Sequence, residues 1–398
     1  MKFNKWTLGL AAVGVVSLTS RVYADETKVS QVNTALSNTT LSGYVDVSAQ
    51  FNPNTGTTQN GGAVKGGPNY YYNQPYNSIN LNVVDITLDK PQDESPWASG
   101  YHVEMFIGPV AQAMGLNNDI RQAYITLRTP VGNGIDWKIG TFDTIVGYES
   151  TTTANNPNYS KSYGYNMEPT THTGVLASYK ATDWISGQFG VADQSYQGGG
   201  AYNASSMNGL YHPTFMWGPT LTAPDSFGWA KGATLSFATI MTGGNINGNT
   251  SNSGSGGKSY YAGLTLPTPI TALKFGAAFD YLNAADIGQN AWNIGAYGSY
   301  QFNDKLSLNL RAEYYNGMPL NAAGAYQQPV ANVNQQAQEI TATVQYSIWA
   351  NVLTRVEFRW DHVNHGNGYY NGSFSGEESA NGTRQNAFML AAQAVYTF

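Results

Sequence analysis

Alternation of apolar and polar residues recurs from residue 41 to the end of the chain, and it constrains the fold more than any other feature. In 41–51 the odd positions hold Leu, Gly, Val, Val, Ala and Phe, whereas the even positions hold Ser, Tyr, Asp, Ser and Gln. A β-strand places successive side chains on opposite faces, so such a segment predicts a strand with one apolar and one polar face.

Sixteen segments follow this pattern. They are predicted at 41–52, 77–90, 98–108, 119–129, 134–143, 172–181, 183–192, 211–223, 231–242, 258–267, 271–283, 290–302, 306–316, 338–348, 352–362 and 385–398. Two of them depart from the simple pattern. The alternation changes phase between Val83 and Val84, which predicts a β-bulge, and Pro213 and Pro219 weaken the eighth segment.

The connections between the segments alternate in length. Short ones at 182, 268–270, 303–305 and 349–351 separate long ones rich in Gly, Asn, Ser and Tyr at 53–76, 144–171, 193–210, 243–257, 317–337 and 363–384. Tight periplasmic turns and long extracellular loops are typical of a membrane barrel. The pattern predicts an all-β, transmembrane, up-and-down antiparallel β-barrel of about sixteen strands. A soluble sandwich has shorter strands, and a propeller would show a blade repeat that is absent here.

Composition and the first residues agree with export to an outer membrane. Charged residues make up 11% of the chain, where about 25% is usual in soluble proteins. Residues 1–24 read as a signal peptide cleaved after Ala24, with Lys2 and Lys5 before an apolar stretch too short to span a membrane. Loss of its three basic residues takes the net charge from −6 to −9, which argues against nucleic-acid binding. We expect a short periplasmic segment at 25–40 and a barrel domain at 41–398.

The chain offers little for catalysis or metal binding. It has no cysteine and five histidines, and it contains no HExxH or GxSxG motif. The sequence therefore predicts a protein that is not an enzyme, without a cofactor or a bound metal.

Several stretches carry a family resemblance. They are "LSGYVD" at 41–46, "DITLDKP" at 85–91, "RQAYITLRTPVGNGIDWKIGTFDTIVGYE" at 121–149, "NPNYSKSYGYNMEPTTHTGVLASY" at 156–179, "LTAPDSFGW" at 221–229 and "LRAEYY" at 310–315. Over 41–398 the chain resembles the OmpL-like β-barrel porins of bacterial outer membranes. The resemblance implies a porin-like channel in a Gram-negative outer membrane and carries no catalytic site.

The polar faces of the strands would line the lumen. The residues predicted to line or narrow the pore are Arg128, Lys138, Asp143, Glu149, Arg311, Glu313, Arg355, Glu357 and Arg359. By analogy with general porins, the loop 144–171 could fold inward, so that Asp143, Glu149 and Glu168 would face lumen arginines. The alternative is an ordinary external loop that covers the mouth. Separately, the alternating charges Arg355, Glu357, Arg359 and Asp361 could shape the field across the pore, or they could form an internal wall of mutually paired charges, which is the interpretation we favour.

Two functions are left open at this point. One is a water-filled channel for passive diffusion of small hydrophilic solutes and ions. The other is an occluded barrel that acts as an adhesin or envelope anchor through its long loops. The expected partners are outer-membrane lipids, lipopolysaccharide and the barrel assembly machinery, which would recognise the terminal Tyr396-Thr397-Phe398. Analogy with other sixteen-stranded porins suggests a homotrimer.

Overall fold

The structure is a computed structural model that describes residues 38–53, 70–72, 77–116, 119–197, 213–242, 257–284, 289–317, 335–366 and 385–398. The predicted signal peptide and most of the segment 25–40 lie outside these residues, as do most of the long loops at 193–210, 243–257, 317–337 and 363–384.

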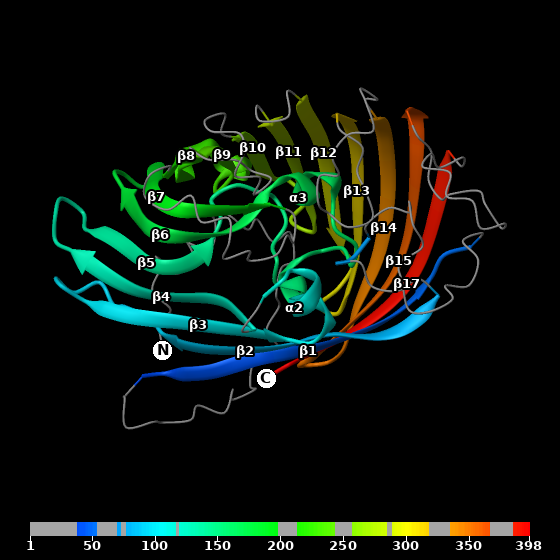
Figure 1. The fold of residues 1–398 in the computed structure, drawn as a ribbon, viewed down its shortest axis with the longest axis horizontal. Helices are drawn as coiled ribbons and strands as arrows, with labels where there is room; N and C mark the ends of the chain where they lie inside the picture. Colours follow the sequence, from blue (N-terminus) through cyan, green and yellow to red (C-terminus); the bar gives the residue numbers. More distant parts are fainter. Residues whose placement is uncertain are drawn as a thin grey trace, which may run out of the picture.

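Sixteen antiparallel strands form one closed barrel (Figure 1). Their bounds are β1 Thr40–Phe51, β2 Ser78–Lys90, β3 Ser99–Ile107, β4 Ile120–Thr129, β5 Ile135–Asp143, β6 Pro169–Lys180, β7 Ile185–Gln197, β8 Thr214–Thr222, β9 Thr234–Thr242, β10 Lys258–Pro267, β11 Leu273–Ala284, β12 Gln289–Gln301, β13 Leu306–Gly317, β14 Gln335–Trp349, β15 Val352–His365 and β17 Asn386–Thr397. Each strand pairs with its neighbours in sequence, and β1 closes the ring by pairing with β17. The predicted fold class is confirmed.

The two faces of the strands differ as the alternation predicts. On β13 and its neighbours the outward side chains are apolar and uncovered, and Leu310, Ile340 and Val356 are 48%, 50% and 55% exposed. The adjacent inward residue Arg311 is only 1% exposed. Because closure leaves no free sheet edge, every strand can pair its backbone groups inside a bilayer.

Local irregularities follow from particular residues. Asp46 pairs with Val83 and Val47 with Leu81, so the β2 bulge is at Asn82, slightly earlier than the predicted phase change. Pro219 lies within β8, and the pairing of β8 with β9 is interrupted at Gly218 and Pro219, where proline has no N–H to donate to the ladder. The eighth strand is therefore present despite its prolines.

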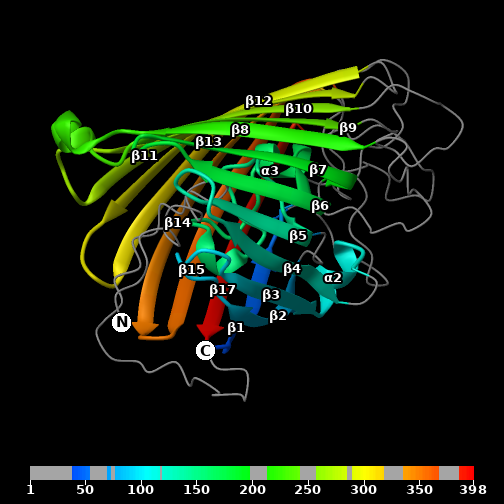
Figure 2. The same cartoon turned by 90° about the vertical axis from the view of Figure 1, so that its left-hand side faces the viewer.

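The connections at one end of the barrel are tight, as predicted. β14 and β15, for example, are separated only by residues 350–351. The turn between β8 and β9 is longer and carries the 3-10 helix η4 (Asp225–Ala230), which projects beyond the strand ends (green, at the left of Figure 2). Within the described ranges, no helix is long and apolar enough to cross a membrane.

Candidate functional site: the filled lumen

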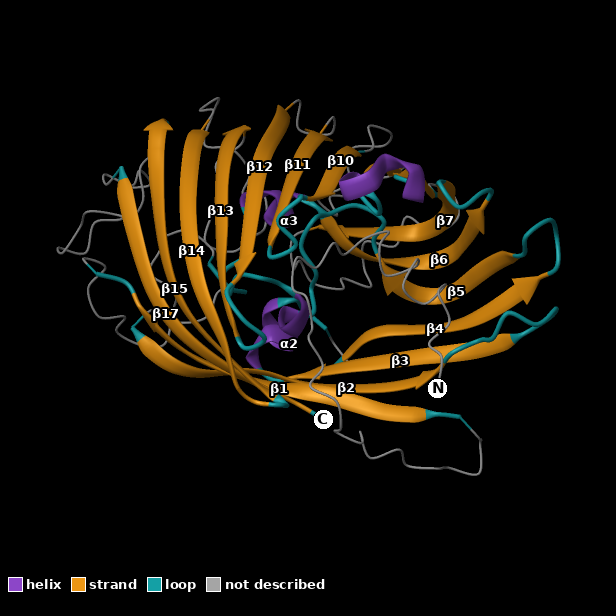
Figure 3. Cartoon of the chain, turned by 180° about the vertical axis from the view of Figure 1, so that it is seen from behind, coloured by secondary structure: helices purple, strands orange, loops and turns teal. Residues whose placement is uncertain are grey.

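The connection 144–168 between β5 and β6 runs inside the barrel. It carries the short helix α3 (Tyr163–Met167), which lies within the ring of strands (Figure 3). Ser162 caps this helix, because its hydroxyl accepts a hydrogen bond from the Tyr165 N–H at 2.9 Å. Nearly all residues of the connection are buried, although loops usually lie on the surface. We call residues 144–168 the inner loop.

Two wall carboxylates hold the backbone of the inner loop. Glu357 on β15 accepts the N–H groups of Tyr159 and Ser160 at 2.5 and 2.8 Å. Glu313 on β13 accepts those of Tyr163 and Gly164 at 2.7 and 3.2 Å. A buried N–H without a partner is costly, so these charge-assisted bonds make an irregular loop tolerable inside the barrel.

Three wall arginines bind the carbonyl groups of the same loop. Arg311 donates to the Ser160 carbonyl at 2.7 Å, and Arg359 donates to the Lys161 carbonyl at 2.6 Å. Arg355 donates to the carbonyl groups of Asn156 and Thr153, the latter at 3.3 Å. The exposed fraction of each arginine is 1% or less. In this structure the three guanidinium groups are therefore covered by the loop.

The arginines are balanced by buried acids. Arg311 forms ion pairs with Glu149 of the inner loop at 2.6 Å and with Glu339 of β14 at 2.7 Å. Arg359 pairs with Asp361 on its own strand at 2.7 Å. Removing such charges from water is costly, and several good hydrogen bonds are needed to offset that cost.

A second ionic cluster holds the start of the inner loop. Arg121 on β4 pairs with Asp143 at the end of β5 and with Glu104 on β3. Gln122 also donates to Glu104, at 2.7 Å. Both Arg121 and Gln122 are buried because the register between β3 and β4 shifts at this point. A bulge puts two successive residues on one face, which simple alternation does not predict.

The wall of β3 to β5 is partly exposed. Lys138 on β5 lies over the Tyr124 ring, with Nζ 4.8 Å from the centroid. His102 on β3 stacks on the same Tyr124 ring, with the ring centroids 5.0 Å apart. Lys138, Tyr124, His102 and Asp143 are all half-buried rather than covered. Arg128 lies apart from these residues, near the turn at residue 133, where it pairs with Asp136 at 2.6 Å.

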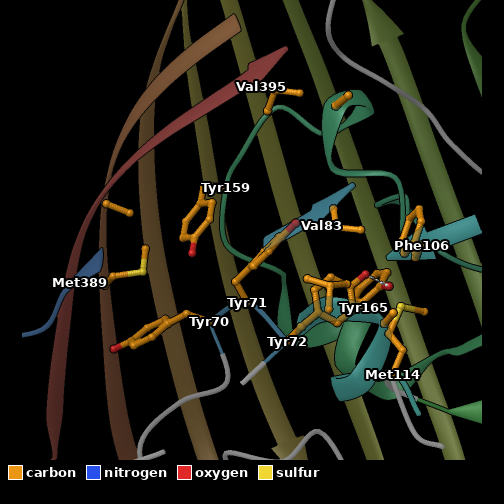
Figure 4. Close-up of a cluster of buried hydrophobic side chains, with 14 of the residues drawn as sticks. Tyr70, Tyr71, Tyr72, Val83, Phe106, Met114, Tyr159, Tyr165, Met389 and Val395 are labelled. Atoms are coloured by element: carbon orange, nitrogen blue, oxygen red, sulfur yellow. Dashed lines mark hydrogen bonds between the residues drawn. The ribbon is translucent and has the colours of Figure 1, made fainter. Parts of the chain in front are cut away.

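A tyrosine-rich segment from another connection joins the inner loop. Tyr71 stacks on Tyr159 with ring centroids 4.8 Å apart, and its hydroxyl donates to Asp46 at 2.7 Å (Figure 4). The Tyr70 carbonyl accepts the Lys161 N–H at 2.7 Å. Residues 70–72 thus add to the filling of the lumen.

The short helix α2 (Pro109–Ala113) fills the lumen from the connection between β3 and β4. Val110, Ala111 and Met114 are buried against Phe106 and the tyrosines of the same cluster (Figure 4). The apolar core of the protein therefore lies inside the ring, between inserted segments and wall.

Lys161 is buried at the centre of the inner loop. Its side chain is 2% exposed, its Nζ donates to the Ser150 carbonyl at 2.5 Å, and it lies 4.5 Å from the Tyr165 ring centroid. Burial lowers the pKa of Lys161 to about 7, against the opposing influence of Glu149.

The structure brings together some of the residues predicted for the pore. Glu149 pairs with Arg311, whereas Asp143 pairs with Arg121, which is not among the residues predicted to line the pore. Glu313, Arg355, Glu357 and Arg359 contact the loop backbone. Arg128 lies apart from the loop. No cluster of three or more potential metal ligands occurs among the residues that the structure describes.

Comparisons with known proteins agree with this architecture. Residues 38–398 match the model of a family described as beta-barrel porin-2, OmpL-like. No curated protein sequence matches the chain significantly.

Solved structures share the fold at low sequence identity. The channel DcaP of Acinetobacter baumannii has a TM-score of 0.57 and 12% identity, covering 90% of this chain and 97% of that one. The anion-selective porin of Comamonas acidovorans has a TM-score of 0.57 and 10% identity, with coverage of 90% and 99%. The trimer form of OmpT from Vibrio cholerae has a TM-score of 0.54 and 14% identity, with coverage of 90% and 99%.

Proposed function

This chain belongs to the OmpL-like β-barrel porin family, and from that premise we propose that it is a narrow channel for passive diffusion of small hydrophilic solutes and ions across the outer membrane. The observation that carries the proposal is the inner loop. Barrels of this strand number are wide enough to leave an aqueous channel, and the inner loop runs inside this barrel with most of its residues buried. Only small solutes would fit the remainder.

The route is proposed along β3 to β5. On this side Lys138, His102 and Asp143 are half-buried, whereas the charges of β13 to β15 are covered by the inner loop. Lys138 and Asp143 would then present opposite charges to a passing solute. Because the surroundings are poorly solvated, such charges influence ions more strongly than they would in water.

Planar-bilayer recordings of refolded protein test this proposal. Stepwise single-channel currents are expected, with a reversal potential in a salt gradient that K138Q shifts toward cations and D143N shifts toward anions. The matched control is D183N, which removes an acid from an exposed turn and should change nothing. Failure of the wild type to conduct would refute the channel, and conduction unaffected by K138Q and D143N would refute the route.

The partners proposed from the sequence remain part of this function. Lipids and lipopolysaccharide would surround the apolar outer face, and the assembly machinery would recognise the terminal Tyr396-Thr397-Phe398 at the end of β17. The trimer form of OmpT supports a homotrimer. Native electrophoresis of detergent-extracted protein should give a species of three chains that dissociates on boiling; a single-chain species would refute the trimer.

An occluded barrel is the second candidate. The observation in its favour is the apolar packing inside the ring, where the inner loop, residues 70–72 and α2 are buried together. It predicts a folded protein that inserts into bilayers without conducting, so the same recordings separate the two functions.

A further inference from the structure

Lys138 lies on the proposed route without a paired acid. It is half-buried on β5, and its Nζ is 4.8 Å from the centroid of the Tyr124 ring. Among the residues that the structure describes, Lys138 has no partner in an ion pair or a hydrogen bond. The ring attracts the ammonium group but does not neutralise it, and its N–H groups are left for another acceptor.

Arginines of the same barrel wall are placed differently. Arg128 pairs with Asp136 at 2.6 Å. Arg359 pairs with Asp361 at 2.7 Å. Withdrawing a charge from water is costly unless a partner compensates for the loss. Because the described part of the fold provides acids for these arginines and none for Lys138, a mobile anion suits Lys138 as a partner.

Two acids of the wall of β2 to β5 limit the charge of that anion. Asp143 accepts hydrogen bonds from Arg121 at both carboxylate oxygens, and an Asp89 oxygen lies 3.0 Å from His102 Nδ1. Both acids are half-buried and add negative charge to the route. They repel an anion with two charges more strongly than an anion with one, so a monovalent anion is favoured.

Two hydroxyl groups beside the ammonium can bind the same anion. The Tyr124 hydroxyl forms no hydrogen bond with a described residue. Thr126 is directly opposite Lys138 in the register of β4 and β5, and its Oγ1 is buried without a partner in the described part of the chain. An unpaired buried hydroxyl is costly, which favours a ligand that accepts from it. A carboxylate has two acceptor oxygens, so it can bind Lys138 and a hydroxyl at once, whereas chloride is a single atom.

The ring that carries the ammonium is held in place from both sides. His102 stacks on Tyr124 with an angle of 20° between the ring planes. Gly140 is opposite Tyr124 on β5, and a Cβ atom there would lie 2.8 Å from the Tyr124 Cα, so this close approach of the strands requires glycine. A site whose groups are ordered in advance loses less entropy when it binds a ligand.

We propose that Lys138, Tyr124 and Thr126 form a subsite for small monocarboxylates, in which the carboxylate of the solute becomes the counter-charge of Lys138. A charge-assisted hydrogen bond from the ammonium holds the solute, and a hydroxyl group provides a second bond. The subsite thus names a solute class for the channel. Its consequence for transport rests on the proposed function, whereas binding itself does not.

Binding is tested by NMR with acetate as the probe, on the full barrel in detergent with ¹³C at the Cε atoms of its lysines. K138R lacks the Lys138 signal and so identifies it in the wild-type spectrum. Acetate should shift this signal until the site is saturated, and chloride at equal ionic strength should shift it less. Lys305, in an exposed turn, is the control and should not respond.

The double variant Y124F/T126V keeps the ammonium and the ring but removes both hydroxyl groups. It should bind acetate about tenfold more weakly, which corresponds to about 1.4 kcal/mol. Sulfate should bind wild type no more tightly than acetate does. No shift of the Lys138 signal, an equal response to acetate and chloride, or tighter binding of sulfate would overturn the subsite.

The transport consequence is tested in bilayers with potassium acetate on one side and potassium chloride on the other. The permeability of acetate relative to chloride should fall in K138Q and be retained in K138R, which keeps a positive donor. K305Q is the matched control and should behave as wild type. A permeability ratio that is unchanged in both K138Q and Y124F/T126V would overturn the role of the subsite in transport. Saturable binding without any current would refute the channel but not the subsite.

Discussion

Arg311 shows at the scale of single residues how the inner loop is retained. Its guanidinium group contacts Glu149, Glu339 and the Ser160 carbonyl, and its side chain is withdrawn from solvent. Arg311 stabilises the fold by pairing with these groups, because each of them would otherwise be buried without a partner.

Replacement of Arg311 by Gln should therefore destabilise the barrel. Breaking a buried ion pair from one side costs about 3–5 kcal/mol, since an acid is left without compensation. Unfolding of R311Q in urea should show a loss of this order. The control is K231Q, which breaks the exposed pair with Asp225 and should change the free energy of unfolding by less than about 1 kcal/mol. Equal losses in the two variants would contradict the buried network.

The ionisation of Lys161 makes the stability of the protein depend on pH, and the direction of this dependence follows from the pKa of Lys161. Its folded pKa of about 7 is below its unfolded value, so between these two values the unfolded chain binds more protons than the folded one. The contribution of Lys161 to stability should thus rise with pH from about 7 to about 10, by at most about 1.4 kcal/mol per pH unit.

K161M removes this ionisation and keeps much of the volume of the side chain. The unfolding temperature of wild type relative to K161M should increase over that pH range. A constant difference between the two proteins would show that Lys161 stays charged in the folded state.

The sequence could predict some of these contacts and not others. By analogy with general porins, Glu149 was one of the loop acids expected to face lumen arginines if the loop folded inward, and it pairs with Arg311. Arg121 was missed because its inward orientation depends on the irregular register between β3 and β4. The charges of 355–361 were expected to pair among themselves; Arg359 pairs with Asp361, but Arg355 and Glu357 bind the inner loop.

At the scale of elements, the strands were predictable and the inserted segments were not. Period-2 alternation is a local signal, so the sixteen strands could be placed before any contact was known. The inward path of residues 70–72 and of α2 depends on partners far away in the sequence, such as Asp46 and Phe106. The inner loop could be suspected only by analogy, because its polar composition also suits an external loop.

A designed disulfide tests the position of the inner loop. Asn158 Nδ2 lies 2.7 Å from Thr343 Oγ1 on β14, and the chain has no native cysteine that could interfere. The N158C/T343C variant should form a cross-link, detected as a shift in mobility on non-reducing gels. In the control N158C/A342C the second thiol is on the outward face of the same strand, and no cross-link should form. Equal cross-linking in both variants would contradict the inward path.

At the scale of the whole molecule, the closed barrel and the inserted loop have different roles. The sheet satisfies its own backbone groups and presents an apolar exterior, which suits it to lipid. The inner loop cannot satisfy its backbone groups alone, and the wall charges of β13 to β15 do so. Residues that look like pore-lining charges in the sequence thereby fix the element that narrows the bore.

The single-channel conductance of a loop-shortened barrel tests this account most directly. Residues 150–166 are replaced by a short Gly-Ser linker, which removes the inner loop but leaves every strand intact. Because the bore of a sixteen-stranded barrel is wide when nothing fills it, conductance should rise at least about twofold over wild type. Unchanged conductance in a correctly folded variant would contradict the claim that the inner loop sets the width of the channel.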